Sequence, residues 1–154
     1  MRIGVIGTGR IGATAAGHFV DAGHEVRLAN SRGPESLTDL VADLGPRASA
    51  GTPAEAGRFG EVVLEAIPFA AYRDLPADAL AARTVMSAAN YWPDPDGDVD
   101  FGGHSHTELV PDHLDGSRVV KSFNTTVWEH LRDQARPGAP LDDAHPLHAA
   151  RYHP

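Results

Sequence analysis

The sequence Met1-Arg2-Ile3-Gly4-Val5-Ile6-Gly7-Thr8-Gly9-Arg10-Ile11-Gly12 joins a short apolar run to three closely spaced glycines. Ile3, Val5 and Ile6 are β-branched, and the run lacks the regular polar alternation of a strand with one exposed face. Such a run is typical of a strand that is buried on both faces of a parallel sheet. This first segment therefore predicts a parallel α/β architecture.

Gly7, Gly9 and Gly12 form the pattern G-x-G-x-x-G directly after this strand. In a strand–turn–helix unit, the first glycine permits the tight turn, the second lets the backbone approach a pyrophosphate, and the third lets the helix pack closely on the strand. The main-chain N–H groups and the positive dipole end at the start of the helix would face that pyrophosphate. Because the chain holds 16 glycines, the pattern alone leaves a purely structural glycine-rich turn as the alternative.

The residues that follow supply the context of a dinucleotide-binding unit. Six residues at helical spacing predict one packed stripe over about three turns, namely Ile11, Thr14, Ala15, His18, Phe19 and Ala22. Gly23 is typical of a helix end, and Glu25-Val26-Arg27-Leu28-Ala29 indicates a second strand. A G-x-G-x-x-G pattern inside a strand–helix–strand unit of this length favours binding of a dinucleotide.

Asn30-Ser31-Arg32 stands at the end of the second strand, where an NAD-binding protein usually has Asp or Glu for the ribose hydroxyls. Asn30 and Ser31 offer neutral hydrogen-bonding groups. The guanidinium of Arg32 can bind a 2′-phosphate with two parallel hydrogen bonds and can stack on adenine. A carboxylate would repel that phosphate, so the segment predicts NADP(H) rather than NAD(H). The alternative is that Arg32 is only a solvated loop residue.

Length, charge and cysteine content limit the possible classes of protein. The 154 residues fit one domain, and the formal net charge of −8 argues against general binding to nucleic acid or to an anionic membrane. The chain has no cysteine, which excludes disulfides and a thiol nucleophile. The first strand is expected to start at residue 2 and no apolar run approaches a membrane span, so we expect a cytoplasmic protein without a signal peptide.

Helical and strand patterns alternate along the rest of the chain. Expected in order are a helix at 34–44, a strand at 47–50, a helix that starts with the capping box Thr52-Pro53-Ala54-Glu55, and a strand at 62–67. There follow a helix at 69–80 interrupted at Pro76, a strand at 84–89, a polar loop at 90–103, a helix at 105–114, a strand at 117–123 and a helix at 126–135.

This alternation predicts a Rossmann-type α/β fold with a doubly wound parallel sheet of strand order 3-2-1-4-5-6. We expect a single domain over residues 1–136. Residues 137–154 are rich in proline and histidine without periodicity, and we expect a poorly ordered tail. The histidines and aspartates of this tail have no spacing that is diagnostic of a metal site.

In such a sheet, a ligand lies beyond the carboxyl ends of the strands, where the strand order reverses. The loops predicted to meet there are Gly7–Gly12, Asn30–Arg32, Ile67–Phe69, Ala89–Trp92 and Phe123–Thr126. Asn90 and Asn124 are the preferred polar candidates, because neutral groups can orient a nicotinamide carboxamide. Tyr91 and Trp92 could stack on a flat ring or only anchor their loop, and Lys121 could contact the cofactor or lie solvated at the sheet edge.

Four further segments extend the likeness beyond the glycine pattern: Asn30-Ser31-Arg32-Gly33-Pro34, Ile67-Pro68-Phe69, Asn90-Tyr91-Trp92-Pro93 and Lys121-Ser122-Phe123-Asn124-Thr125. With these segments in this order, the chain resembles the coenzyme F420-dependent NADP oxidoreductase family. It is most similar to the bacterial branch of NADPH-dependent F420 reductase-like proteins. The resemblance runs from residue 1 to about residue 138.

The resemblance implies a role for particular residues around the cofactor. Between Gly7 and Gly12, the residues Thr8, Gly9, Arg10 and Ile11 would line the pyrophosphate turn. Ser31 and Arg32, next to Asn30, would hold the 2′-phosphate. Ile67 and Pro68 would border the nicotinamide ribose, with Asn90 and Asn124 close to the ring.

The implied activity is hydride exchange between NADP(H) and the deazaflavin coenzyme F420, a small-molecule redox partner. Both carbons that carry the hydride would belong to cofactors, so the protein mainly has to stack two rings and exclude water. Positioning alone can supply several kcal/mol of barrier reduction. The resemblance therefore implies neither a catalytic side chain nor a metal ion.

The sequence departs from the family pattern after about residue 138. Family members continue with a stretch resembling Gly-Asp-Asp…Asp-x-Gly-Pro-Leu, which helps to form the deazaflavin pocket and the dimer. Either the activity of this chain is altered, or another chain completes the pocket, as in a homodimer. Two alternatives stay open: a non-catalytic or degenerate NADP(H)-binding protein, and an NADPH-dependent reductase of another small substrate.

Overall fold

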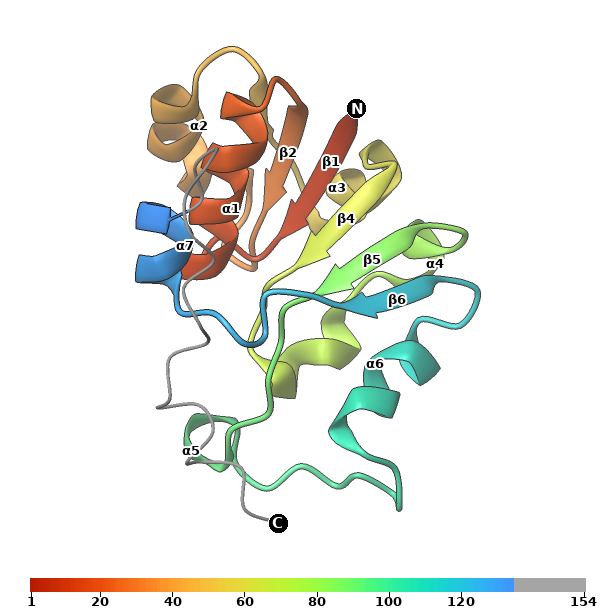
Figure 1. Ribbon diagram of the computed structural model, residues 1–154. Helices are drawn as coiled ribbons and strands as arrows, with labels where there is room; N and C mark the ends of the chain where they lie inside the picture. The colour runs from red at the N-terminus through yellow and green to blue at the C-terminus, as the bar shows by residue number, and fades with distance from the viewer. Residues whose placement is uncertain (135–154) are drawn as a thin grey trace.

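Six parallel strands form one sheet in the computed structural model, which describes residues 1–134 (Figure 1). The strands are β1 (Arg2–Ile6), β2 (Glu25–Ala29), β3 (Ala48–Ala50), β4 (Val62–Glu65), β5 (Thr84–Ser87) and β6 (Arg118–Lys121). Their order is β3-β2-β1-β4-β5-β6, and every neighbouring pair is parallel. The predicted fold class, a single Rossmann-type α/β domain with the order 3-2-1-4-5-6, is confirmed.

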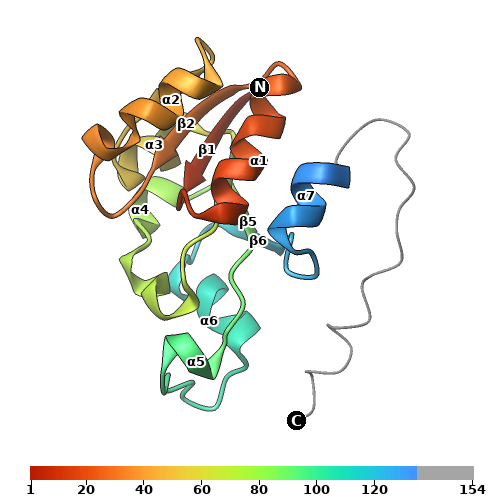
Figure 2. The ribbon, with the colours of Figure 1, turned by 90° about the vertical axis from the view of Figure 1, so that its left-hand side faces the viewer.

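Helices cover both faces of the sheet (Figures 1 and 2). One face carries α1 (Arg10–Asp21), the 3-10 helix η1 (Pro34–Leu37), α2 (Thr38–Leu44) and α7 (Trp128–Gln134). The other carries α3 (Pro53–Phe59), the 3-10 helix η2 (Phe69–Asp74), α4 (Ala77–Leu80) and α6 (His106–His113). Although α1 and α7 lie far apart in the sequence, they are side by side in both views.

Each face of the sheet buries its own apolar cluster. Val5, Leu28 and Leu64 occupy paired positions on three adjacent strands beneath α1 and are fully buried. On the opposite face, Val85 packs in one cluster with Phe69 of η2. Full burial of such a side chain stabilises the fold by about 1.5–3 kcal/mol, so the strands are held chiefly by these two layers of helices. The prediction that the first strand is buried on both faces is confirmed.

α3 can cross the sheet closely because Gly4 has no side chain. A Cβ atom at Gly4 would lie 2.3 Å from the carbonyl oxygen of Ala56. The helix begins with the predicted capping box, in which Glu55 N donates to Thr52 Oγ1 at 3.2 Å and Thr52 N donates to Glu55 Oε2 at 2.7 Å. The bonds from Thr52 favour the charged carboxylate and hold the pKa of Glu55 below its ordinary value.

The packed face of α1 differs in part from the predicted stripe. Gly12, Ala15 and Ala16 are its buried residues, and a Cβ atom at Gly12 would lie 1.9 Å from the carbonyl oxygen of Gly7. His18 lies instead toward α7, where its Nε2 is 2.8 Å from the carbonyl oxygen of Leu131. The stripe is thus confirmed in part, since Ala15 is buried and Phe19 packs against the same cluster. His18 differs because α7 gives α1 a second packed face, which the local sequence pattern does not reveal.

Several element boundaries also differ from the predictions. The predicted helix at 69–80 divides into η2 and α4 around Leu75 and Pro76, at the expected interruption. The loop after β5 contains the single turn α5 (Pro93–Asp96), in which Trp92 N donates to Asp96 Oδ2 at 2.9 Å. Strands β4, β5 and β6 end earlier than predicted, because the chain leaves the sheet to form loops at its carboxyl edge.

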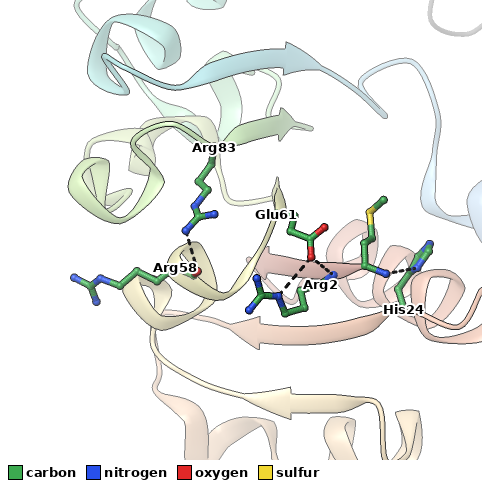
Figure 3. Close-up of polar contacts among 6 residues, drawn as sticks. Arg2, His24, Arg58, Glu61 and Arg83 are labelled. Carbon is green, nitrogen blue, oxygen red and sulfur yellow. Dashed lines mark hydrogen bonds and ion pairs between the residues drawn. The ribbon is translucent and has the colours of Figure 1, made fainter.

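Polar contacts tie neighbouring elements together at the amino edge of the sheet (Figure 3). Arg2 donates from N and from Nε to Glu61 Oε1 at 3.4 and 3.5 Å. Arg83 Nη2 donates to the carbonyl oxygen of Arg58 at 3.2 Å. Exposed contacts of this kind contribute little to stability, and this edge lies opposite the loops predicted to bind a ligand.

Within residues 1–134, no helix is long and apolar enough to cross a bilayer. No group of three His, Cys, Asp or Glu side chains in that range is arranged to hold a metal ion. The expected tail at 137–154 lies outside the described residues. The cytoplasmic location stays a prediction.

Candidate functional site

Two adjacent pockets open at the carboxyl edge of the sheet, where the strand order reverses between β1 and β4. The first pocket, of about 430 Å³, lies between the glycine turn, Asn30–Arg32 and Ile67–Pro68. The second pocket, of about 630 Å³, lies between the glycine turn, Ala88–Asn90 and Phe123–Glu129. Both are lined by Gly9, Ala66, Ile67 and Pro68, so the two pockets adjoin at the switch point and are together called the groove.

The glycine turn leaves room for a ligand at only one of its glycines. Gly7 has a φ of +101°, and a Cβ atom there would lie 2.4 Å from the carbonyl oxygen of Ala66. A Cβ atom at Gly12 would lie 1.9 Å from the carbonyl oxygen of Gly7. At Gly9, by contrast, no atom lies within 4 Å of such a position. The first and third glycines therefore serve packing, and the second keeps an open approach to the backbone.

α1 begins at this opening with Gly9 as its N-cap, and no side chain caps the helix. The first N–H groups of a helix have no partner within the helix, and they carry the positive end of its dipole. This arrangement fits a pyrophosphate lying over Gly9. The predicted glycine-turn residues all line one or both pockets except Gly12, which lies beneath the turn.

Asn30 organises the loop after β2 more than it faces the pocket. Its Oδ1 accepts a hydrogen bond from Arg32 N at 2.9 Å, and its Nδ2 donates to Ser36 Oγ at 2.9 Å and to Thr8 Oγ1 at 3.4 Å. Ser31 and Arg32 are exposed and line the first pocket. The only other charged residue that lines this pocket among the described residues is Asp74. The structure therefore brings Asn30, Ser31 and Arg32 together with the glycine turn, as predicted.

The second pocket joins the loops after β5 and β6. Asn90 Nδ2 donates to the backbone carbonyl oxygen of Asn124 at 2.9 Å. Phe123 precedes this contact with a φ of +60°, a left-handed conformation that a bulky residue rarely adopts. Both asparagines line the pocket together with Ile67 and Pro68, so the predicted residues of this half also meet.

Glu65 and Lys121 lie directly behind this second pocket. Glu65 is fully buried, and its Oε1 accepts a hydrogen bond from Ile67 N at 3.1 Å. Burial raises the pKa of Glu65 above its ordinary value, and the neighbouring Ser87 hydroxyl, the Ile67 N–H and Lys121 oppose this shift without cancelling it. Lys121 Nζ donates to the carbonyl oxygen of Ala89, and partial burial lowers the pKa of this lysine. This contact with Ala89 is neither of the two roles predicted for Lys121, which were contact with the cofactor and solvation at the sheet edge.

Several pocket residues were not predicted from the sequence. Trp128 lines the second pocket, with the guanidinium carbon of Arg10 5.4 Å and that of Arg132 4.8 Å from its ring centre. Pro53 and Asp74 line the first pocket. Trp128 could have been suspected from its position just after the loop of Asn124, whereas nothing local marks Pro53 or Asp74.

The fold and the groove define the class of the protein, which is an NAD(P)-binding Rossmann domain. The family model described as "NADP oxidoreductase coenzyme F420-dependent" matches residues 2–91, more than half of the chain. The chain belongs to this family of NADP-dependent oxidoreductases. A comparison with curated proteins finds no match.

Solved structures agree with this membership. The hypothetical protein SMa0349 from Sinorhizobium meliloti is 30% identical with a TM-score of 0.76, and the match covers 90% of this chain and 68% of that one. A protein from Arthrobacter sp. FB24 assigned as an F420-dependent NADP reductase is 25% identical with a TM-score of 0.71, covering 90% and 69%. A reductive aminase from Aspergillus terreus, solved with NADPH and ethyl levulinate, shares the fold at 16% identity and a TM-score of 0.62, covering 84% and 43%.

Proposed function

We propose that the protein binds NADP(H) along the groove and exchanges hydride with the deazaflavin coenzyme F420. The observation that carries this proposal is that the two pockets adjoin along Gly9, Ala66, Ile67 and Pro68. A dinucleotide has two nucleoside halves joined by a pyrophosphate, and this shape matches two pockets joined at a helix N-terminus. Family membership and the resemblance of the Arthrobacter protein support the choice of F420 as the redox partner.

In this arrangement the adenosine half lies in the first pocket. The exposed guanidinium of Arg32 supplies the positive charge beside the 2′-phosphate, and Ser31 supplies a neutral hydroxyl. Asp74 lines the same pocket and partly offsets that charge. The neutral amide of Asn30, already bonded to Arg32 N, adds no repulsion. These residue types favour NADP(H) over NAD(H).

The nicotinamide half then lies in the second pocket, between Pro68 and Asn124. When bound, the two cofactors would supply the chemistry: a hydride with its two electrons would pass from C4 of NADPH to C5 of the deazaflavin, and a proton from solvent would complete reduced F420. Among the described residues that line this pocket there is no nucleophilic dyad; most are apolar, aromatic or amide-bearing, and Thr126, Arg10 and Glu129 are the hydroxyl and charged members. Such walls orient a ring and exclude water, which is the contribution that a protein makes to transfer between two cofactors.

The test is a parallel titration of the protein with NADPH and NADH by calorimetry, followed by addition of oxidised F420. We expect tighter binding of NADPH and a loss of deazaflavin absorbance that matches NADPH consumption. Tight NADPH binding without hydride transfer would reject the F420 activity and favour a non-catalytic NADP(H)-binding protein. NADPH consumption with an imine or carbonyl compound, but not with F420, would instead identify a reductase of another substrate.

A further inference from the structure

Three polar side chains lie in one row at the carboxyl ends of β4, β5 and β6. The strand register pairs Glu65 of β4 with Ser87 of β5, and Ser87 with Lys121 of β6. Paired residues of neighbouring parallel strands point to the same face, so the row faces the layer of η2 and α6. Glu65 and Ser87 are fully buried, and they are the two buried polar residues in the described part of the chain.

Each end of this row holds a loop of the second pocket. Glu65 Oε1 accepts the N–H of Ile67 at 3.1 Å, which fixes the loop after β4. Lys121 Nζ donates to the carbonyl oxygen of Ala89, which fixes the loop after β5. Ile67 and Ala89 both line the second pocket, whereas Glu65 and Lys121 do not. The hydrogen bonds of the row thus reach the pocket at the loops after β4 and β5.

Burying these polar side chains costs desolvation free energy. Burial raises the pKa of Glu65 and lowers that of Lys121, so for both groups desolvation outweighs their mutual attraction. Glu65 Oε2 and the Ser87 hydroxyl make no hydrogen bond of good geometry within residues 1–134, although the hydroxyl is close enough to Glu65 to favour its charged form. Apolar side chains of similar volume at such positions usually leave a fold equally or more stable. Stability of the sheet therefore does not explain these residues.

We propose that Glu65 and Lys121 are positioning residues for the nicotinamide half of the cofactor. They hold Ile67-Pro68 and Ala89-Asn90 at the separation that the nicotinamide and its ribose require. Within the described residues, the loop of Asn30–Arg32 receives no hydrogen bond from the row, and Ala89-Asn90 lines only the second pocket. Ile67-Pro68 borders both pockets, so the effect of the row is expected to fall mainly on the nicotinamide half, and most selectively for Lys121. The inference rests on the proposed function in one respect, the placement of nicotinamide in the second pocket.

The test compares two ligands on the full chain. NADPH occupies both pockets, whereas adenosine 2′,5′-bisphosphate keeps the adenosine and its phosphates but has no nicotinamide. For Glu65→Leu and for Lys121→Met we expect the dissociation constant of NADPH to rise about tenfold, the effect of one buried hydrogen bond. Binding of the bisphosphate should stay within about twofold of the wild type, which is close to the resolution of a binding titration.

Conservative and structural controls separate positioning from loss of folding. Glu65→Gln keeps the acceptor for the Ile67 N–H and should bind NADPH within about threefold of the wild type. Val63→Ala shortens a fully buried side chain two residues earlier on the same face of β4. It should lower the melting temperature without changing the ratio of the two affinities. Glu65→Leu should melt at the wild-type temperature or above it.

Equal weakening of both ligands, or no change in either, by Glu65→Leu and Lys121→Met would overturn the inference. Should Glu65→Leu fail to fold, Lys121→Met makes the same comparison from the other end of the row. The outcome is separate from that of the proposed function. A protein that shows the predicted split between the ligands but transfers no hydride to F420 would sustain the positioning role and refute the redox partner. A protein that reduces F420, but whose variants weaken both ligands equally, would support the redox partner and refute the positioning role.

Discussion

The side-chain amide of Asn30 donates a hydrogen bond to Thr8 Oγ1 at 3.4 Å and thereby joins the loop after β2 to the glycine turn after β1. Its oxygen accepts the N–H of Arg32 at 2.9 Å. One neutral side chain thus sets the position of both loops that are expected to hold phosphate groups. A carboxylate could replace only the acceptor half of this arrangement.

Asn30→Asp is therefore expected to reduce the preference for NADPH over NADH. The aspartate can still accept the Arg32 N–H, but it loses the donor to Thr8 and places a negative charge beside the expected 2′-phosphate. NADPH binding should weaken about tenfold, while NADH binding should change by less than about twofold. Calorimetric titration with both nucleotides measures the change. Equal weakening of both would mean that Asn30 acts only through the shape of the loop.

Arg32→Ala tests how much the positive charge of the guanidinium contributes to the preference for NADPH. Loss of a hydrogen bond to a charged group costs about 1.5–3 kcal/mol, so NADPH binding should weaken by that amount while NADH binding is nearly unchanged. Arg47→Ala is the matched control, because Arg47 is also exposed but lies before β3, away from both pockets. A similar loss in the control would attribute the effect to net charge rather than to contact with the phosphate.

The glycines of the turn should differ sharply in their tolerance of alanine. Gly12→Ala places a methyl group 1.9 Å from the carbonyl oxygen of Gly7, so α1 must move away from the turn. Overpacking of this kind destabilises a fold by about 3 kcal/mol, which thermal unfolding would show as a large fall in melting temperature. Gly9→Ala meets no atom within 4 Å and should leave the melting temperature unchanged.

The same methyl group at Gly9 would stand where the pyrophosphate is expected to approach the backbone. Gly9→Ala should therefore weaken binding of NADPH and of NADH alike, measured in the same titrations. Unchanged binding would place the pyrophosphate elsewhere. The pair of variants thus separates the structural glycine from the ligand-binding one.

The sequence was sufficient for the strand order, because buried apolar runs such as Val62–Glu65 and the glycine pattern are local signals with few structural solutions. It failed where a residue depends on an element distant in the sequence. His18 was predicted as a packed residue of the first helix and is partly buried, but its partner, the carbonyl oxygen of Leu131 in α7, could not be predicted. That contact joins residues 113 positions apart and leaves no local trace.

In the candidate site, too, local sequence signals predicted the positions of the loops but not the contacts between them. The loops around Arg32 and Asn124 could be located from the positions at which strands end. The bonding of Asn90 to the Asn124 backbone depends on the distance between two loops, which no periodicity encodes. Glu65 interrupts an apolar strand and was a detectable anomaly, but its contact with Ile67 N becomes apparent only in the folded chain.

Intrinsic fluorescence should report the nicotinamide half directly. The chain has two tryptophans, Trp92 and Trp128, and both line the second pocket. Binding of NADPH should quench their emission, because the reduced nicotinamide absorbs light where tryptophan emits. Adenosine 2′,5′-bisphosphate, which has no nicotinamide, should bind with little quenching.

Trp128→Phe and Trp92→Phe assign the signal to each side of the second pocket. Each variant should retain part of the quenching by NADPH, since the other tryptophan still lines the pocket. Calorimetry on the same variants shows whether binding itself has changed. NADPH binding without quenching in the wild type would contradict placement of the nicotinamide in this pocket.

The buried carboxyl of Glu65 should make stability depend on pH with a defined sign. Its pKa in the folded protein is raised above the ordinary value of 4.5, so the folded state binds the proton more tightly than the unfolded state does. Stability contributed by the protonated group is complete below pH 4.5 and is lost as the pH rises through the folded-state pKa. Glu65→Gln imitates the protonated form at every pH.

The variant Glu65→Gln should therefore melt at a higher temperature than the wild type, and this difference should be larger at about pH 8 than at about pH 5. In the Lys121→Met background the difference should widen, because the positive charge that opposes the shift is gone. Glu25→Gln, which removes an exposed carboxylate from β2, controls for the loss of one negative charge. A Glu65→Gln effect that stays constant with pH would show that the carboxyl ionises as easily in the folded chain as in the unfolded one.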